Sequence, residues 1–341
     1  MNHSIRVGLI GAGANTRLRH IPGLRAVNGV AIVGVCNRRP ESTKAVASEF
    51  NIAKTYARWE DLIADPEIDA IVIGTWPYLH CPITLAALQA GKHVMTEARI
   101  SMNADEARRM LAASQQHPSL VTQVVPSPFG LKGHDVMVDL LANGFIGDLR
   151  EVRVFNFNGA FADPNAPLTW RQDATLSGCN MLTLGIVHET LMRWVPPVVS
   201  LIAQTHAHIP TRSERAVGTP DSVQVSAKLQ GGACVTYHFS GATAFGQTAG
   251  IELFGTKGTL CYDLLTDTIR GGQAGRLSDL PNIPIPTAKA RAWNVEADFI
   301  AAIRAHKPIA FTTFEAGVAY MEFTEAVARN AMTGMSEPRT Q

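Results

Sequence analysis

Short apolar runs alternate with segments of helical spacing over the first third of the chain. The apolar runs end in glycine or polar residues, as buried parallel strands do. Asn103, followed by Glu106 three residues later, is a typical helix N-cap. This alternation predicts a parallel sheet with helices on both faces. The predicted strands span 5–10, 31–35, 68–73, 93–95 and 120–125, and the predicted helices span 16–27 with an interruption at Pro22, 40–50, 59–64, 82–90 and 103–116.

The pattern changes near residue 125, where Pro126, Pro128 and Gly130 mark a junction. Later segments alternate apolar and polar residues, which predicts an antiparallel sheet with one exposed face. We expect the Gly/Pro-rich segment 271–286 to be a loop. The predicted strands here span 149–157, 222–229, 233–239, 250–254 and 259–262, and the predicted helices span 133–143, 181–195, 293–305 and 314–332.

Length and composition narrow the class of protein. A chain of 341 residues predicts about two domains. The net charge of +1 gives no general electrostatic basis for binding nucleic acid or an anionic membrane. No apolar run has the length of a signal-peptide core or a membrane span. The five cysteines are scattered, which favours a reduced, cytoplasmic setting.

Other polar residues carry less information. His206 and His208 share one face of a probable strand, but no acidic or cysteine partner lies near them in the sequence. We therefore expect no metal site. Glu296 and Asp298 do not share a helix face and are interpreted as solvated charges.

A glycine turn follows the first strand. It runs Gly11-Ala12-Gly13-Ala14-Asn15-Thr16 and opens the first helix. The first glycine allows a tight turn, and the second lets the backbone approach a pyrophosphate at the helix N-terminus. Thr16 stands where the usual pattern has a third glycine. The position of this turn within a βαβ unit predicts a dinucleotide site rather than a purely structural turn.

The residues after the second strand bear on cofactor choice. This position normally carries a carboxylate that binds the 2′-hydroxyl of the adenosine ribose. Here the chain has Asn37, Arg38 and Arg39 instead. Guanidinium groups pair well with a 2′-phosphate, so the sequence favours NADP over NAD. The alternative is that one or both arginines are solvated surface charges.

Two further motifs give a resemblance to a known family. They are Thr75-Trp76-Pro77-Tyr78-Leu79-His80 and Ala90-Gly91-Lys92-His93-Val94-Met95-Thr96-Glu97. Together with the glycine turn they resemble the glucose–fructose oxidoreductase / inositol dehydrogenase / MocA family, and the resemblance extends over essentially the whole chain. It implies an α/β fold with an NAD(P)-binding Rossmann domain over 1–125. It also implies a substrate-binding and oligomerisation domain over 126–341, which has a large open, mainly antiparallel sheet and closing helices able to pack back on the first domain.

The resemblance also implies site residues. Tyr78 and Arg99 are candidates for substrate binding in the first domain, and Trp170 and Arg171 are candidates in a sugar-binding loop, although core packing is the common alternative for Trp170. The candidate cofactor-binding residues are Gly11, Gly13, Ala14, Asn15, Thr16, Asn37, Arg38, Arg39, Thr75, Trp76, His80 and Glu97.

This sequence departs from the family pattern at the residues expected to carry out the reaction. Glu97-Ala98-Arg99 replaces the family's Glu-Lys-Pro. Thr183 and Val187 occupy the positions of its Asp and His, and a histidine comes one residue later, at His188. His188 is the candidate general acid/base because its ordinary pKa suits proton transfer near neutral pH. The alternative is a buried structural or surface histidine.

The leading hypothesis is an NAD(P)-dependent oxidoreductase acting on a sugar, polyol or related hydroxy or keto compound. Two alternatives remain: a cofactor-assisted lyase or glycoside-cleaving enzyme without net redox change, and a non-catalytic cofactor-bound sensor. We expect a small-molecule substrate as the partner. The resemblance implies a homodimer or homotetramer joined through the C-terminal sheet.

Overall fold

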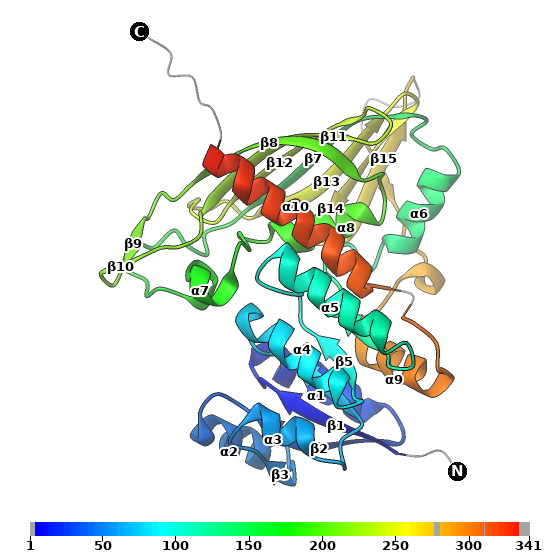
Figure 1. Ribbon diagram of the computed structural model, residues 1–341. Helices are drawn as coiled ribbons and strands as arrows, with labels where there is room; N and C mark the ends of the chain where they lie inside the picture. The colour runs from blue at the N-terminus through cyan, green and yellow to red at the C-terminus, as the bar shows by residue number, and fades with distance from the viewer. Residues whose placement is uncertain (1–3, 276–279, 310, 334–341) are drawn as a thin grey trace. The chain divides into compact units, whose positions relative to one another are not determined.

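The chain forms two compact units (Figure 1). The computed structural model describes residues 4–275, 280–309 and 311–333. The first unit comprises the described residues within Met1–Pro126, Leu176–Gly178 and Asn294–Met321. The second comprises those within Ser127–Thr175, Cys179–Trp293 and Glu322–Gln341. The first closing helix, α9 (Val295–Ala305), therefore belongs to the first unit.

A six-stranded parallel sheet forms the centre of the first unit, with strand order β3-β2-β1-β4-β5-β6. The predicted parallel sheet is confirmed. The strand order reverses direction between β1 and β4, which is where open α/β sheets bind ligands at their carboxyl edge. The strands are β1 (Ile5–Ile10), β2 (Val30–Cys36), β3 (Lys54–Thr55), β4 (Ala70–Ile73), β5 (His93–Thr96) and β6 (Thr122–Val124).

The helices of the first unit have bounds close to those predicted from the sequence. The Asn103 cap is confirmed, since its Oδ1 accepts a 2.9 Å hydrogen bond from the Glu106 N–H. The predicted helix over 16–27 is instead a π-helical turn, η1 (Thr16–His20), followed by α1 (Ile21–Ala26), which has Pro22 in its first turn. The others are α2 (Pro40–Glu49), α3 (Trp59–Ala64), η2 (Pro77–Leu79), α4 (His80–Gln89) and α5 (Ala104–Gln116).

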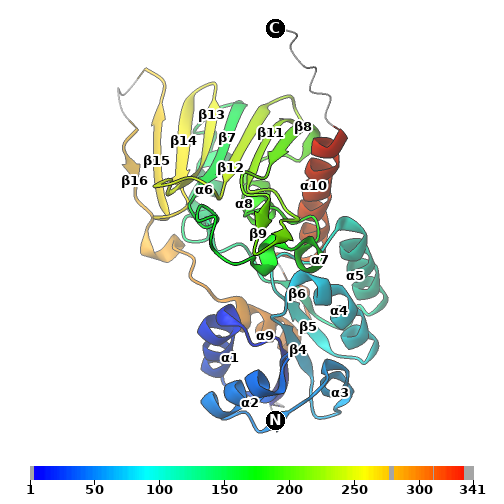
Figure 2. The same ribbon diagram turned by 90° about the vertical axis from the view of Figure 1, so that its left-hand side faces the viewer.

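An eight-stranded sheet forms the second unit, with order β16-β15-β14-β13-β7-β12-β11-β8 (Figure 2). All its neighbours are antiparallel except β7 and β12. The predicted mainly antiparallel sheet is thus confirmed. Its strands are β7 (Leu149–Phe157), β8 (Val198–His206), β11 (Ser222–Leu229), β12 (Cys234–Ser240), β13 (Thr248–Gly255), β14 (Gly258–Asp263), β15 (Thr268–Gln273) and β16 (Asn282–Ile283); β9 (Thr211–Arg212) and β10 (Arg215–Ala216) form a separate pair.

The predicted loop over 271–286 is partly wrong, because β15 and β16 occupy part of it. Gly271 lies within β15, and a Cβ there would come within 2.7 Å of Leu260 and 2.8 Å of Ile283. Glycine is therefore a packing requirement at this point of the strand. Residues 276–279 lie outside the described residues.

One face of the larger sheet carries the core of the second unit. Helices α6 (His134–Ala142), α8 (Leu184–Met192) and α10 (Phe314–Thr333) supply apolar side chains to it. Along β11 burial alternates residue by residue, so the opposite face is the exposed one. Short η3 (Trp170–Gln172), α7 (Ala174–Ser177) and η4 (Thr287–Lys289) complete the described helices.

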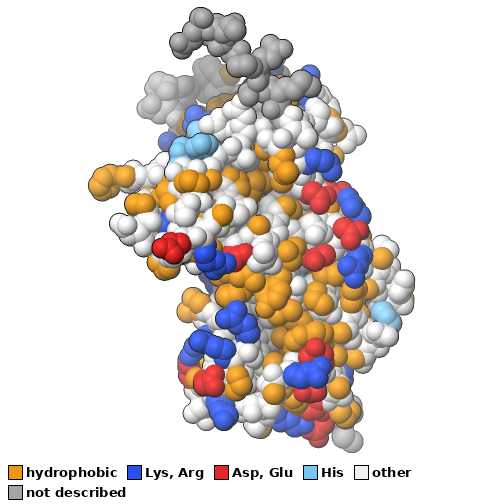
Figure 3. Space-filling view, turned by 60° about the vertical axis from the view of Figure 1, so that its left-hand side comes forward, with side chains coloured by type: hydrophobic (Ala, Val, Ile, Leu, Met, Phe, Trp, Pro, Cys, Tyr) orange, Lys and Arg blue, Asp and Glu red, His pale blue; other side chains and the backbone are white. Residues whose placement is uncertain are grey.

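Within the described residues, no helix combines the length and apolar character needed to cross a membrane. None of the five cysteines forms a disulfide. On the face seen in Figure 3, acidic and basic side chains are interspersed rather than separated by sign.

Candidate active site

The glycine turn forms the floor of the candidate cofactor site. Gly11 has φ +87°, and a Cβ there would come within 2.5 Å of the Thr75 backbone nitrogen. A Cβ at Gly13 would meet only the Gly74 carbonyl oxygen, at 3.9 Å. Gly11 is thus required by the fold, whereas Gly13 leaves open space beside the backbone, as a bound pyrophosphate would need.

Thr16 and Asn37 shape this turn from within. The Thr16 side chain is buried, and its hydroxyl donates a 3.0 Å hydrogen bond to the Gly11 carbonyl. The Asn37 Oδ1 accepts a 2.6 Å hydrogen bond from the Ala12 N–H, and its amide nitrogen donates to the Ser42 carbonyl. Both residues therefore hold the loop in place, and their predicted contact with the cofactor stays a prediction.

A cavity of about 620 Å³ lies over this floor. Its wall includes Arg38, Arg39 and Trp76, and the Arg38 guanidinium lies 5.4 Å from the Trp76 ring centroid in a cation–π contact. Gly11, Gly13, Asn37 and Thr75 line the same cavity, and so does Tyr78, a predicted substrate contact.

Sequence reasoning missed several residues of this wall, among them Ser42, Arg58, Trp59 and Glu60. Arg58 brings a third guanidinium to the cavity, and its Nε lies 3.5 Å from Oε2 of Glu60, a carboxylate of the same wall. The residue stands just before a helix, far from the glycine motif in sequence, so no motif pointed to it. The cavity therefore combines backbone space for a pyrophosphate with positive charge for a further phosphate.

His80 is buried and clamps backbone segments together. Its Nδ1 lies 2.9 Å from the Arg99 carbonyl oxygen, and its Nε2 lies 3.0 Å from that of Thr75. Burial lowers the pKa of His80 despite these acceptors. His80 therefore positions the Thr75 loop against the segment that carries Arg99, which is itself buried. Ala14 is exposed at the start of the helix.

Glu97, at the carboxyl end of β5, belongs to a buried polar cluster. Its Oε1 accepts hydrogen bonds from the Asn15 side-chain amide and from His20, whose Nε2 lies 2.9 Å away. The other ring nitrogen of His20 lies 2.5 Å from Glu296 Oε1. The interpretation of Glu296 as a solvated charge is wrong, because only 2% of its side chain is exposed; Asp298 is exposed as predicted.

Partners set the charges of this cluster. Burial alone would lower the pKa of His20, but the hydrogen bonds to Glu296 and Glu97 raise it to about 9. Burial alone would raise the pKa of Glu97, but the bonds from His20 and Asn15 keep it below its ordinary value. His20 is therefore an imidazolium near neutral pH, and Glu97 is a carboxylate.

His188 lies in the core of the second unit. Its Nδ1 is 2.8 Å from the Tyr237 hydroxyl, and its ring stacks on Phe323 with centroids 3.7 Å apart. Burial lowers the pKa of His188 to about 3, so the ring is neutral. These contacts favour a structural histidine, the alternative that the sequence left open, and proton transfer by His188 stays a prediction.

Trp170 and Arg171 also belong to the second unit. The Arg171 guanidinium lies 4.3 Å from the Trp170 ring centroid, so one face of the indole already carries a cation. Arg171 is exposed and Trp170 is half-buried. Tyr78 and Arg99 lie in the first unit. A shared substrate site for these four side chains and His188 stays a prediction.

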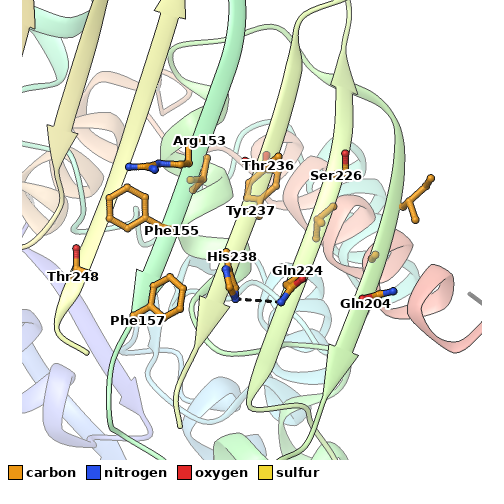
Figure 4. A pocket seen from close by; sticks show the side chains of 14 residues that line it. Arg153, Phe155, Phe157, Gln204, Gln224, Ser226, Thr236, Tyr237, His238 and Thr248 are labelled. Atoms are coloured by element: carbon orange, nitrogen blue, oxygen red, sulfur yellow. Dashed lines mark hydrogen bonds between the residues drawn. The ribbon is translucent and has the colours of Figure 1, made fainter. Parts of the chain in front are cut away.

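A second cavity, of about 730 Å³, lies on the exposed face of the larger sheet. Figure 4 shows its side chains projecting from neighbouring strands, with the Gln224–His238 hydrogen bond crossing between β11 and β12. Phe157 packs edge-on against His238, with centroids 4.6 Å apart. The cavity is a shallow mixture of apolar and polar groups. Among the described residues, no three His, Cys, Asp or Glu side chains are grouped to hold a metal ion.

The parallel sheet with this strand order, its glycine turn and the arginine-lined cavity define a dinucleotide-binding protein of the Rossmann class. Residues 5–124 match the model of the oxidoreductase family with an NAD-binding Rossmann fold, and residues 134–261 match the GFO/IDH/MocA C-terminal domain. The chain belongs to this family and is an NAD(P)-dependent oxidoreductase, which confirms the resemblance and the leading hypothesis.

Named relatives agree with this assignment. The chain is 30% identical over 256 residues to 1,5-anhydro-D-fructose reductase of Ensifer adhaerens, covering 75% of this chain and 74% of the relative. It is 26% identical over 300 residues to bovine (Bos taurus) trans-1,2-dihydrobenzene-1,2-diol dehydrogenase, covering 85% and 81%. The fold is similar to that of levoglucosan dehydrogenase in complex with NADH and L-sorbose, with a TM-score of 0.87, 21% identity and coverage of 96% and 97%.

The two glycines of the turn are expected to respond differently to substitution. Gly13→Val fills open space, so the variant should keep a melting temperature near that of the wild type but lose most of its NAD(P)H binding. Gly11→Ala forces a Cβ against Thr75 at a positive φ and should lower the melting temperature itself. Calorimetry and fluorescence titration with NADH and NADPH test both variants. Binding of either nucleotide by Gly13→Val at wild-type affinity would contradict the placement of the cofactor.

A paired substitution tests the role of His188. His188→Phe leaves the buried Tyr237 hydroxyl without its partner and should cost about 1–3 kcal/mol of stability, whereas His188→Phe/Tyr237→Phe should recover much of that loss. Because the folded-state pKa of about 3 lies below the ordinary 6.5, stability from neutral His188 is complete above pH 6.5 and declines as pH falls toward 3.

The melting temperature of the double variant should therefore fall less between pH 7 and pH 5 than that of the wild type. Cofactor-linked turnover is measured on the same samples. A double variant that keeps its melting temperature but loses turnover about 100-fold would support proton transfer by His188 instead.

Proposed function

We propose that this protein is an NADP-preferring oxidoreductase that interconverts a hydroxyl and a carbonyl group on a sugar, polyol or related diol. The observation that carries the cofactor preference is the cavity over the glycine turn. Arg38, Arg39 and Arg58 line it, and Asn37 stands where NAD-binding proteins carry a carboxylate. The Glu60 carboxylate pairs with Arg58 on this wall, so Arg38 and Arg39 carry the excess positive charge that favours a ligand with an extra phosphate.

The chain's own residues bind and orient in this proposal. Gly11 and Gly13 admit the pyrophosphate, Arg38 pairs with the 2′-phosphate while its guanidinium stays near the Trp76 ring, and Glu97 accepts a hydrogen bond from the cofactor. When bound, the nicotinamide supplies the hydride acceptor or donor. Tyr78, Arg99, Trp170 and Arg171 are proposed to position the substrate, and His188 is the untested candidate for moving its proton.

The substrate class rests on the relatives. Proteins named for 1,5-anhydro-D-fructose and trans-1,2-dihydrobenzene-1,2-diol share most of their length with this chain. Both names denote compounds with neighbouring oxygen-bearing carbons. A vicinal diol or hydroxy-ketone is therefore the first class to assay by nicotinamide absorbance. Because the five cysteines form no disulfide, these assays are best run under reducing, cytoplasm-like conditions.

The exposed sheet face is proposed to join copies of this chain into a homodimer or homotetramer. Ile202 on β8 is 70% exposed and lines the cavity on that face with Phe155 and Phe157. Such an apolar area mixed with hydrogen-bonding groups suits a protein interface.

Replacing Arg38 tests the cofactor preference. Arg38→Ala should weaken NADPH binding about 10- to 100-fold, because a charge-assisted contact to phosphate is lost, while NADH binding changes by less than about threefold. Arg109→Ala removes an exposed arginine of the same unit outside the cavity and should change neither. Fluorescence titration measures the affinity of each variant for NADPH and for NADH. Equal losses for NADPH and NADH in Arg38→Ala would refute a 2′-phosphate contact.

A charge on the exposed sheet face tests the oligomer. Ile202→Lys should reduce the wild-type assembly to monomers in light scattering, because a buried lysine would lack a partner there. Leu265→Lys, in the turn between β14 and β15, adds the same charge at another exposed leucine and should leave the mass unchanged. A monomeric wild-type protein would refute the proposed interface.

A further inference from the structure

His20 joins segments that lie far apart in the sequence. It ends η1, and none of its side chain is exposed. One ring nitrogen bonds Glu97 at the end of β5, and the other bonds Glu296 on α9. A neutral imidazole can donate from only one nitrogen, so two carboxylate acceptors require the doubly protonated ring. The cluster is thus an ion triad rather than a pair of neutral hydrogen bonds.

The triad controls one oxygen of Glu97 and leaves the other available. Oε1 accepts from both His20 and Asn15. Oε2 accepts only a long hydrogen bond, 3.3 Å, from the Ala98 N–H among the bonds described. A carboxylate offers about four acceptor positions, so Oε2 retains capacity. The Glu97 side chain as a whole is 15% exposed, so it is not sealed into the core as His20 is.

Glu296 keeps His20 in place. Its side chain is buried, and a Cβ on Gly23 would come within 2.5 Å of its Oε2. The carboxylate therefore lies directly against α1, in the space that Gly23 leaves open. Removing one partner of a buried ion pair leaves the other charge uncompensated, so each member depends on the others.

We propose that His20, fixed by Glu296, is a positioning residue that holds Glu97 to accept a hydrogen bond from the nicotinamide-ribose half of the dinucleotide. This inference rests on the proposed function. Glu97 follows β5 at the carboxyl edge of the parallel sheet, the edge where such sheets bind ligands. A ribose hydroxyl and a carboxamide N–H are both donors, so an ionised, oriented carboxylate suits that half. The phosphate-bearing half instead requires the cations of the arginine-lined cavity.

The triad also predicts a pH dependence. The hydrogen bonds to Glu296 and Glu97 raise the pKa of His20, and Glu97 in turn faces Asn15 and the buried His80. Because the pKa of His20 is raised from 6.5 to about 9, its contribution is complete below pH 6.5 and is lost as the pH rises through about 9. Binding of the nicotinamide half should weaken over the same range.

The experiment compares NADPH with 2′,5′-ADP, which carries the 2′-phosphate and the adenosine-side phosphate but lacks the nicotinamide half. Glu296→Gln keeps the shape of the side chain and removes its charge. It should weaken NADPH binding about 10-fold while 2′,5′-ADP binding changes less than about twofold. The pH at which NADPH binding declines should also move from about 9 toward 6.5. Arg38→Ala serves as the control, because it should weaken the binding of both NADPH and 2′,5′-ADP.

Each outcome decides the question. Equal weakening of both ligands in Glu296→Gln, or an unchanged pH profile, would overturn the positioning role. Failure of the wild-type protein to bind either ligand would instead overturn the proposed function. His20→Gln should repeat the selective loss of NADPH binding, and if that variant does not fold, as its melting curve would show, Glu296→Gln alone decides. Direct titration of the His20 ring by NMR should give a pKa near 9 in the wild type and a lower value in Glu296→Gln.

Discussion

The arrangement of the first unit depends on close contact between backbone segments at the carboxyl ends of β1 and β4. Gly11 donates its N–H to the Cys36 carbonyl of β2, and Gly74 donates to the Ile10 carbonyl of β1. No side chain fits between Gly11 and the Thr75 nitrogen. Because three strand ends meet this closely, the turn faces the cavity with backbone groups, and the arginine wall begins directly beside it.

The same constraint explains how much the sequence could predict. Alternation of strands and helices, the glycine turn and the Asn103 cap are local patterns, and the structure confirms them. The His20–Glu296 pair joins residues 276 positions apart, so no local pattern contained it. The sequence predicted a loop at Gly271. The close approach of Leu260 and Ile283, which favours a glycine there, arises only when three strands pack together.

The two buried histidines show why the candidate site was harder to predict than the fold. His20 and His188 have the same side chain and similar burial, yet their pKa values move in opposite directions. His20 faces two carboxylates, whereas His188 faces a hydroxyl and an aromatic ring. Partners therefore decide the charge, and a sequence names residues without naming their partners. One helical position turns a side chain by about 100°, which separates a site residue from a core residue.

Positive and negative side chains gather at different places in the first unit, which the net charge of +1 for the chain does not show. The cavity wall carries three arginines and one carboxylate, Glu60, while the cluster around Glu97 holds two carboxylates against one imidazolium. An NADP molecule has a similar division, with a phosphate-rich half and a half that offers hydroxyl and amide donors. Opposite local charges favour one orientation of such a ligand and oppose its reverse, since a reversed phosphate would approach carboxylates. Orientation of the dinucleotide thus follows from electrostatics as well as from the shape of the turn.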